Sequence, residues 1–243
     1  TKIVLYKTGN SYIFDLEDVT FNNKDSIIVY DEYDEIWILP HHRKINEQYL
    51  RELFNTKVNV VPYIWDDVFI KSFENYLIKN DSKLMYEPNE GLKDITIFEP
   101  NINVVKSSIF PMLIANNAYK KRPELINKVR VMNSYQLNEN SRFLSIVEKL
   151  DLYKDEIITF ESRYPTPYIL SRATDVVLSH QWENELNNLY FDTLYARYPL
   201  VHNSSILSRT GYYYPDFDID AGTNQLINAL SFNVMDQKYI IYC

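Results

Sequence analysis

The pattern of apolar and polar residues alternates between short apolar runs and longer amphipathic stretches. In the first third, the runs KIVLY, SIIVY and DEIWILP, at 2–6, 26–30 and 34–40, are typical of strands. The stretch NEQYLRELFN, 46–55, predicts a helix, and KVNVVP, 57–62, predicts the strand that follows it. This order of strand, helix and strand indicates an α/β segment.

Residues 63–93 interrupt this alternation. They contain one amphipathic stretch, FENYLIKN, and then a polar run, NDSKLMYEPNEGLKD. A polar run of this kind favours a connection between two domains. We therefore predict an α/β domain at 1–64, a linker at 65–93 and a second domain at 94–243.

Beyond residue 93 the alternation becomes regular. Short apolar runs predict strands at 94–98, 129–133, 156–160, 175–179 and 199–203, and amphipathic stretches predict helices at 107–121, 141–150, 165–173, 185–198 and 223–231. Helices between successive strands are crossover connections, which join parallel neighbours. The second domain is therefore predicted to be a doubly wound parallel sheet with helices on both faces.

Composition limits the classes of function. The chain has 243 residues, of which 46% are hydrophobic, and this is enough to bury a core. Its formal net charge of -8 argues against nucleic-acid binding, because phosphate backbones are bound by a surplus of Lys and Arg.

The cysteine count and the hydropathy bear on location. A single cysteine, Cys243, excludes a disulfide framework and favours a reducing, cytoplasmic compartment. No apolar run approaches the roughly 18 residues that cross a bilayer, and the first residues do not have the layout of a signal peptide. We expect a cytoplasmic protein.

In open α/β sheets, ligands bind beyond the carboxyl ends of the strands, so the loops there are the candidate site. The loop EPNINVVKSS, 99–108, lacks the glycines of a dinucleotide or P-loop motif. Lys106 nevertheless precedes a predicted helix whose free N–H groups favour an anion, and Asn101 and Asn103 add donors. A diphosphate fits this description, and a capped helix with one solvated lysine is the structural alternative.

The predicted helix at 185–198 carries a second candidate. Asp192 follows Glu185 by seven residues, which places both at nearly the same angle on a helix. A carboxylate partway along such a helix is able to accept both hydroxyls of a ribose. The alternative is a solvated helix face.

Other candidate chemistry is weaker. His180 and His202 each end a predicted strand and, with Glu183, suggest metal ligands, but such sites need three convergent ligands, so we expect no metal. The chain has no G-x-S-x-G motif for a serine hydrolase. The aromatic run GYYYPDF, 211–217, suits either stacking on a base or sugar, or anchoring a loop.

Four motifs follow one another along the chain: EPNINVVK, DVVLSHQWEN, YPLVHN and GYYYPDFD. Together they resemble the C-terminal part of a GT-B glycosyltransferase of the family-four type, and in particular a little-characterised branch of that superfamily from bacteria and large DNA viruses. The resemblance covers nearly the whole chain. It implies that residues 1–64 end an acceptor-side α/β domain, that 94–243 form the donor-nucleotide-binding Rossmann-like domain, and that the chain is truncated at its N-terminus.

The activity that the resemblance implies is transfer of a sugar from a nucleotide-diphosphate sugar to a hydroxyl of a glycan or another acceptor. Retention of configuration and the absence of a cofactor or metal are expected, and membrane contact is expected only through the missing segment. By resemblance, Glu183 and His180 are catalytic and face the donor sugar, and the donor is bound by Asn101, Asn103, Lys106, Arg163 and Asp192.

This sequence departs from the family pattern. The arginine of the phosphate loop is missing, the spacing of the two acids is one residue longer, and Arg197 or Tyr198 replaces a turn glycine. Two alternatives therefore stay open: a non-catalytic module that binds a glycan or nucleotide, and a nucleotide-sugar epimerase. A structural interaction protein is the third alternative. Because the chain is expected to be truncated, it is also expected to bind the donor without transferring its sugar.

Overall fold

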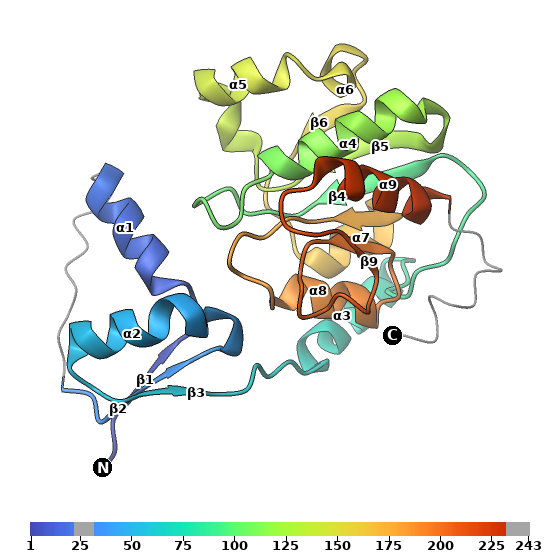
Figure 1. Cartoon of the computed structure of the whole chain (residues 1–243). Coiled ribbons are helices and arrows are strands. Elements are labelled where there is room, and N and C mark those ends of the chain that lie inside the picture. Colours follow the sequence, from blue (N-terminus) through green and yellow to red (C-terminus); the bar gives the residue numbers. More distant parts are fainter. Residues whose placement is uncertain (22–31, 232–243) are drawn as a thin grey trace. The chain divides into compact units, whose positions relative to one another are not determined.

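The computed structural model describes residues 1–21 and 32–231. The predicted strand at 26–30 lies outside the described residues. The chain divides into two compact units (Figure 1). Unit 1 comprises Thr1–Trp65 and Trp182–Leu186, and unit 2 comprises Asp66–Gln181 and Asn187–Cys243.

Unit 1 is a small parallel α/β sheet. Its strands are adjacent in the order β1-β2-β3, and its core is formed by Ile36, Ile38 and Leu50. The elements are β1 (Val4–Lys7), α1 (Ser11–Phe21), β2 (Glu35–Ile38), α2 (Arg43–Phe54) and β3 (Val58–Val60). The sequence did not predict α1 because Tyr12, Leu16 and Val19 on this helix are exposed, so it has no continuous buried apolar stripe.

Unit 2 contains a six-stranded sheet in the order β6-β5-β4-β7-β8-β9, and every neighbouring pair is parallel. The strands are β4 (Lys93–Ile97), β5 (Ile126–Val131), β6 (Ile158–Phe160), β7 (Val176–Leu178), β8 (Leu200–His202) and β9 (Tyr212–Tyr213). Numbered from the first strand of the unit, this is the 3-2-1-4-5-6 order of a doubly wound dinucleotide-binding sheet. The predicted fold class is confirmed.

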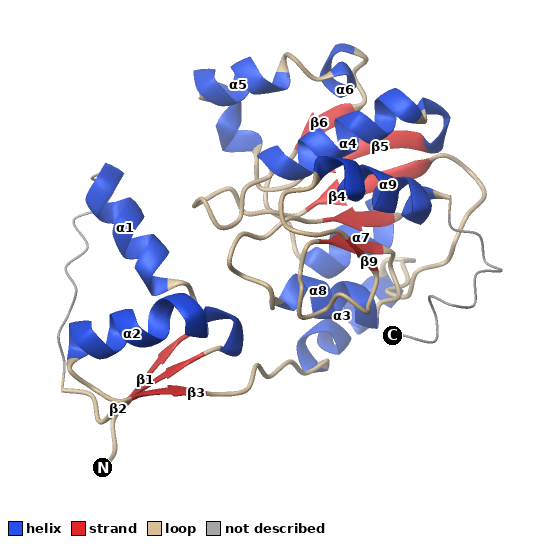
Figure 2. Cartoon of the chain, in the orientation of Figure 1, coloured by secondary structure: helices blue, strands red, loops and turns tan. Residues whose placement is uncertain are grey.

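Helices cover both faces of this sheet (Figure 2). The helices α4 and α9 lie side by side on one face, and α3, α7 and α8 lie on the other. The bounds are α3 (Val68–Lys79), α4 (Ile109–Lys121), α5 (Ser141–Val147), α6 (Asp151–Lys154), α7 (Thr166–Ala173), α8 (Asn188–Tyr195) and α9 (Ile219–Leu230). The main core lies between the sheet and the helices, and includes fully buried Ile95, Ile114 and Leu226.

Side-chain caps set where three of these helices begin. Asn140, Asn187 and Asp218 accept hydrogen bonds from backbone N–H groups in the first turns of α5, α8 and α9. Such caps satisfy donors that have no partner inside the helix. The cap at Asn187 starts α8 three residues later than predicted, so Glu185 lies before the helix.

Other boundaries also differ from the prediction. The helix α3 lies within the predicted linker at 65–93 and packs against α7. The predicted helix at 141–150 is shorter in the structure, because α5 ends at Val147, and the separate short helix α6 begins only after the predicted segment, at Asp151. The strand β9 has only two residues, which is too short for a visible alternation.

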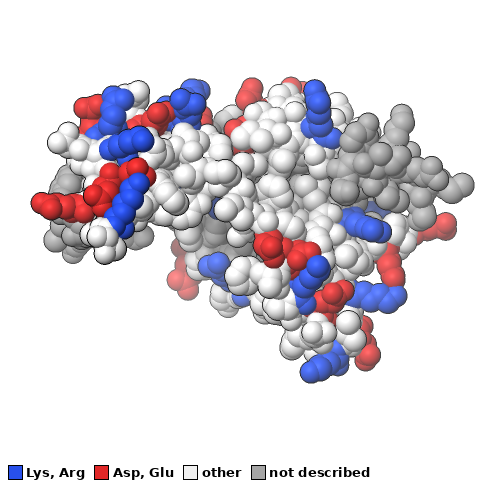
Figure 3. Space-filling view, turned by 90° about the horizontal axis from the view of Figure 1, so that it is seen from below, with Lys and Arg blue, Asp and Glu red and all other residues white. Residues whose placement is uncertain are grey.

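The surface is mixed in charge. On the face drawn in Figure 3, acidic and basic side chains are interspersed over the described residues. Within residues 1–21 and 32–231, no helix combines the length and the apolarity needed to cross a membrane.

Candidate functional site

The site is positioned by the two central strands of unit 2. The strands β4 and β7 are neighbours, but the crossover after β4 leads to β5 on one side, and the crossover after β7 leads to β8 on the other. The loops that leave them therefore separate at the carboxyl ends of the sheet, which is where doubly wound folds bind their ligands. These loops are 99–108 after β4 and 179–187 after β7.

Glu99, at the carboxyl end of β4, joins the two loops. Its side chain is fully buried. Its Oε1 accepts hydrogen bonds from the Ser179 hydroxyl at 2.5 Å, the His180 backbone N–H at 3.0 Å and the Gln181 side-chain amide at 3.4 Å. Its Oε2 is buried and has no hydrogen-bond partner among the described residues. One carboxyl oxygen thus fixes the turn after β7.

The charge of this carboxyl is finely balanced. Burial raises the pKa of Glu99 to about 7, although the hydrogen bonds from Ser179 and His180 oppose the shift. Burial lowers the pKa of Lys106, and the charge of Glu99 raises it in turn. Within the described ranges, the Lys106 ammonium makes no hydrogen bond or ion pair. A fully buried acid and a half-buried base therefore lie on one loop without a direct contact.

His180 is a neutral imidazole held in a ring of aromatic side chains. Its ring centroid lies 4.3 Å from that of Phe110 and 4.6 Å from that of Phe217. The Tyr214 hydroxyl donates to the Ser179 carbonyl at 3.1 Å, so the His180 Nδ1–H donates to Tyr214 Oη at 3.1 Å. Burial lowers the pKa of His180 to about 4. Its buried Nε2 is then an unprotonated acceptor with no partner among the described residues.

The helix α8 contributes Tyr190, which is fully buried and has its hydroxyl 3.3 Å from the Ser179 hydroxyl. We call the residues that converge here the switch-point cluster: Glu99, Lys106, Ser179, His180, Tyr190 and Tyr214. Lys106 and His180 were singled out from the sequence, and Tyr214 lies in the aromatic run 211–217 noted there. The positions of Glu99 and Ser179 after buried strands could be recognised from the sequence, but the burial of Glu99 could not.

Asn101 and Asn103, which were predicted to donate hydrogen bonds to a diphosphate, shape the loop that carries Lys106. Asn101 adopts a left-handed φ of 55°. Its Oδ1 accepts from the Ser108 N–H at 2.8 Å, and its Nδ2 donates to the Glu99 carbonyl at 3.0 Å. Asn103 Oδ1 accepts from the Lys106 N–H at 3.2 Å. Each of these side-chain amides makes at least one hydrogen bond to the backbone of the same loop. These hydrogen bonds fix the backbone at Lys106.

Asp192 and Arg163 are not among the residues of the switch-point cluster. On α8 the buried face carries Tyr190 and Thr193, and Asp192 is half-buried on another face, because successive residues turn by about 100°. The prediction that Glu185 and Asp192 share a helix face is wrong, since α8 starts at Asn188. Arg163 is exposed and follows β6, the edge strand of the sheet, two strands from β4.

Glu183 belongs to the segment of unit 1 that interrupts unit 2. It is half-buried, with a left-handed φ of 51°. Its backbone carbonyl accepts a hydrogen bond from Asn10 Nδ2 at 3.5 Å, within unit 1. A left-handed glutamate is uncommon, and such backbone is found where the surrounding structure holds it in place.

The second histidine has a structural role. His202 is fully buried; its Nε2–H donates to the Thr210 carbonyl at 2.7 Å, and its Nδ1 accepts from the Ser204 N–H at 3.2 Å. Both ring nitrogens are therefore occupied. Among residues 1–21 and 32–231, no group of three His, Cys, Asp or Glu side chains is placed to hold a metal ion.

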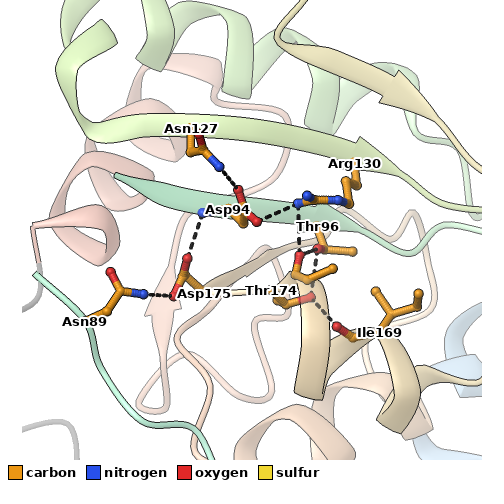
Figure 4. Close-up of polar contacts among 9 residues, drawn as sticks. Asn89, Asp94, Thr96, Asn127, Arg130, Ile169, Thr174 and Asp175 are labelled. Atoms are coloured by element: carbon orange, nitrogen blue, oxygen red, sulfur yellow. Dashed lines mark hydrogen bonds and ion pairs between the residues drawn. The ribbon is translucent and has the colours of Figure 1, made fainter. Parts of the chain in front are cut away.

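A cavity of about 460 Å³ lies at the opposite, amino-terminal edge of the sheet. Asp175 accepts from the Asp94 N–H at 2.8 Å and from Asn89 at 2.7 Å (Figure 4). Asp94 in turn accepts from Asn127 at 2.7 Å and pairs with Arg130 at 2.8 Å. Because these carboxylates are satisfied by neighbours, the wall of this cavity is a structural network that ties the connection before β4 to the sheet.

Comparison with known proteins supports the fold. A family model described as "Protein of unknown function (DUF2827)" matches residues 1–240. No curated protein matches the sequence. Among solved structures, the trehalose-6-phosphate synthase OtsA is similar with a TM-score of 0.60 and 14% identity, over 86% of this chain and 54% of that one.

Two further structures have the same arrangement. A UDP-forming alpha,alpha-trehalose-phosphate synthase from Burkholderia xenovorans has a TM-score of 0.59 and 14% identity, over 85% of this chain and 55% of that one. WaaG, a glycosyltransferase involved in lipopolysaccharide biosynthesis, has a TM-score of 0.54 and 11% identity, over 95% of this chain and 75% of that one. The chain spans about half the length of the two synthases. At these identities the likeness shows the fold, which is GT-B.

Proposed function

The chain belongs to the DUF2827 family, and we propose that it is the donor-binding part of a GT-B glycosyltransferase that transfers a sugar from a nucleotide-diphosphate sugar to a hydroxyl acceptor. The observation that carries this proposal is the switch-point cluster. It places a half-buried lysine, Lys106, at the carboxyl edge of a doubly wound sheet, where such folds bind nucleotides.

The diphosphate is proposed to lie beside Lys106 and the start of α4. Helix N-termini attract anions through their free N–H groups and the helix dipole. The turn made by Asn101 and Asn103 fixes the backbone at Lys106, three residues before the first residue of α4. The charge on the leaving diphosphate would then be stabilised by groups already in place, which is how preorganised sites lower a barrier.

The other donor contacts follow the family resemblance. Asp192 is proposed to accept the ribose hydroxyls, Arg163 to lie toward the base, and Glu183 to face the donor sugar. His180 is proposed to lie near the donor sugar as a neutral imidazole, because its low pKa makes it a poor proton donor. In the transfer step, the bond from the anomeric carbon to the diphosphate oxygen breaks and a bond to the acceptor oxygen forms. The acceptor proton leaves with the diphosphate or solvent.

Titration calorimetry of the chain with UDP-glucose, GDP-mannose and ADP-glucose tests this proposal. We expect one of these donors to bind, and Lys106→Met to weaken its affinity at least about tenfold, the scale of one lost charge-assisted hydrogen bond. The matched control is Lys149→Met, which removes an exposed lysine just after α5 and should leave the affinity unchanged. Equal affinities of the Lys106 variant and wild type would contradict the proposed diphosphate site.

Product analysis separates the proposed activity from its alternatives. A binding module shows donor affinity but no turnover with any acceptor. An epimerase converts the nucleotide sugar when no acceptor is added. A glycosyltransferase releases the nucleoside diphosphate in step with formation of a new glycoside, and Glu183→Gln should lower that rate more than it lowers donor affinity.

A further inference from the structure

We propose that Glu99, a carboxyl that the donor does not touch, takes up a proton when the donor diphosphate binds beside Lys106. The inference rests on the donor site proposed above and adds a regulatory property to it. Donor affinity would then depend on pH through a residue buried behind the site rather than through a group in contact with the ligand.

The buried position of Glu99 explains why it influences donor binding without touching the donor. No part of its side chain is exposed, and its Oε1 already accepts hydrogen bonds from the turn after β7. Lys106 lies on the same loop, 99–108, and its carbonyl accepts a hydrogen bond from the Asn101 N–H at 3.1 Å, so the loop folds back toward Glu99, whose charge raises the pKa of Lys106. In the free protein, the ammonium of Lys106 is therefore the charge that offsets an ionised Glu99.

The other groups around Glu99 cannot replace that offset. From the turn after β7, Ser179 and Gln181 donate hydrogen bonds but carry no charge, and His180 is neutral because burial lowers its pKa to about 4. From α8 and from the segment after β9, Tyr190 and Tyr214 face this region, and burial raises the pKa of Tyr214. Lys106 is therefore the basic side chain among these groups whose charge acts on Glu99.

A bound diphosphate changes this balance. It pairs with Lys106 and brings negative charge into a poorly solvated region, where a like charge favours the protonated form of a carboxyl. Burial has already raised the pKa of Glu99 to about 7, so little further change is needed for the complex to hold the proton at neutral pH. Because the complex binds more protons than the free protein, affinity must fall as pH rises through the pKa of the free state.

Calorimetric titration at pH 6, 7 and 8 measures this linkage. The probes are UDP-glucose, GDP-mannose and ADP-glucose, because their diphosphate is doubly esterified, whereas a terminal phosphate titrates near pH 6. If Glu99 stays protonated in the complex, the affinity of the wild-type chain should be about tenfold lower at pH 8 than at pH 6. Titrations at pH 7 in two buffers of different ionisation enthalpy should count uptake of about half a proton.

The variant Glu99→Gln keeps the shape of the side chain and an oxygen that accepts from Ser179 and His180, but it cannot titrate. Its affinity should be the same at pH 6 and pH 8, and it should bind the donor without proton uptake. Glu148→Gln is the matched control, because Glu148 is exposed at the end of α5, and this variant should behave as wild type. If proton uptake persists in the Glu99 variant, the proton is taken up by Lys106 and the inference is overturned.

The remaining outcomes separate the inference from the proposed function. Binding by the wild-type chain with one affinity at all three pH values and no proton uptake overturns the inference and leaves the donor site standing. Failure of all three donors to bind overturns the proposed function and the inference with it. If the Glu99 variant does not fold, the wild-type chain still tests the inference: uptake of about half a proton at pH 7 together with an affinity about tenfold lower at pH 8 than at pH 6 supports it, and absence of either overturns it.

Discussion

Replacing Gly211 with alanine is expected to destabilise unit 2. Gly211 begins the run GYYYP, and its φ of 65° is in the left-handed region. An added Cβ would lie 2.7 Å from the Leu200 carbonyl oxygen and 3.4 Å from the His202 ring. The carbonyl belongs to β8, so no side-chain rotation relieves the contact.

The size of the effect follows from three contributions. Left-handed backbone costs an ordinary residue roughly 1–2 kcal/mol, and overpacking of this kind typically costs about 1–3 kcal/mol. The reduced entropy of the unfolded chain returns about 0.4–1 kcal/mol. We therefore expect Gly211→Ala to lower the free energy of unfolding by about 1–4.5 kcal/mol.

Urea unfolding followed by far-ultraviolet circular dichroism measures this change. All three tryptophans, Trp37, Trp65 and Trp182, belong to unit 1, so tryptophan fluorescence follows the other unit in the same samples. Gly91→Ala is the matched control, because its Cβ would meet only Asn89 Oδ1 at 3.5 Å. Its effect should stay within about 0.5 kcal/mol. Equal unfolding free energies for the two variants would refute the argument.

Further predictions concern the network at the amino edge and the buried titratable groups. Asp175→Ala removes the acceptor of the Asp94 N–H and should lower the free energy of unfolding by about 2 kcal/mol in the same assay; a change below about 0.5 kcal/mol would contradict the network. Burial lowers the pKa of His180 and of His202 to about 4, so the unfolded chain binds protons on both rings between about pH 6.5 and 4 while the folded chain does not. The free energy of unfolding should therefore decrease as the pH is lowered from about 6.5 to 4, by up to roughly 1.4 kcal/mol per pH unit for each ring. His202→Gln should make this decrease shallower when unfolding is measured at several pH values. The raised pKa of Glu99 acts in the opposite direction, with stability lost as pH rises from about 4.5 to 7, so Glu99→Gln should make the acid slope steeper.

Most of the fold of unit 2 was predictable because each central strand of a covered parallel sheet is a short apolar run. The runs around Ile95 and Val177 are buried on both faces and could be recognised without tertiary information. Elements that depend on tertiary contacts were missed. Helix α1 presents Leu16 and Val19 to solvent, so its sequence has no helical apolar stripe facing a core.

The site was predictable only in outline. Lys106 follows from the rule that ligands bind at the carboxyl ends of parallel strands. Glu99 was not recognised because a carboxylate after a strand normally lies in solvent, and its burial depends on Ser179 and His180, which are about 80 residues away in the chain. The helix register of Asp192 was wrong because one capping amide, on Asn187, decides where α8 begins.

The brief return of the chain to unit 1 at Trp182–Leu186 matters for anyone who recombines such proteins. A chimera joined after Trp65 would take these five residues from the second parent. Within unit 1, the Glu183 carbonyl accepts from Asn10, and Asn184 lies 3.4 Å from the His42 ring nitrogen. A graft that respects the architecture must carry this pentapeptide along with the first parent, even though it sits in the middle of the other parent's sequence.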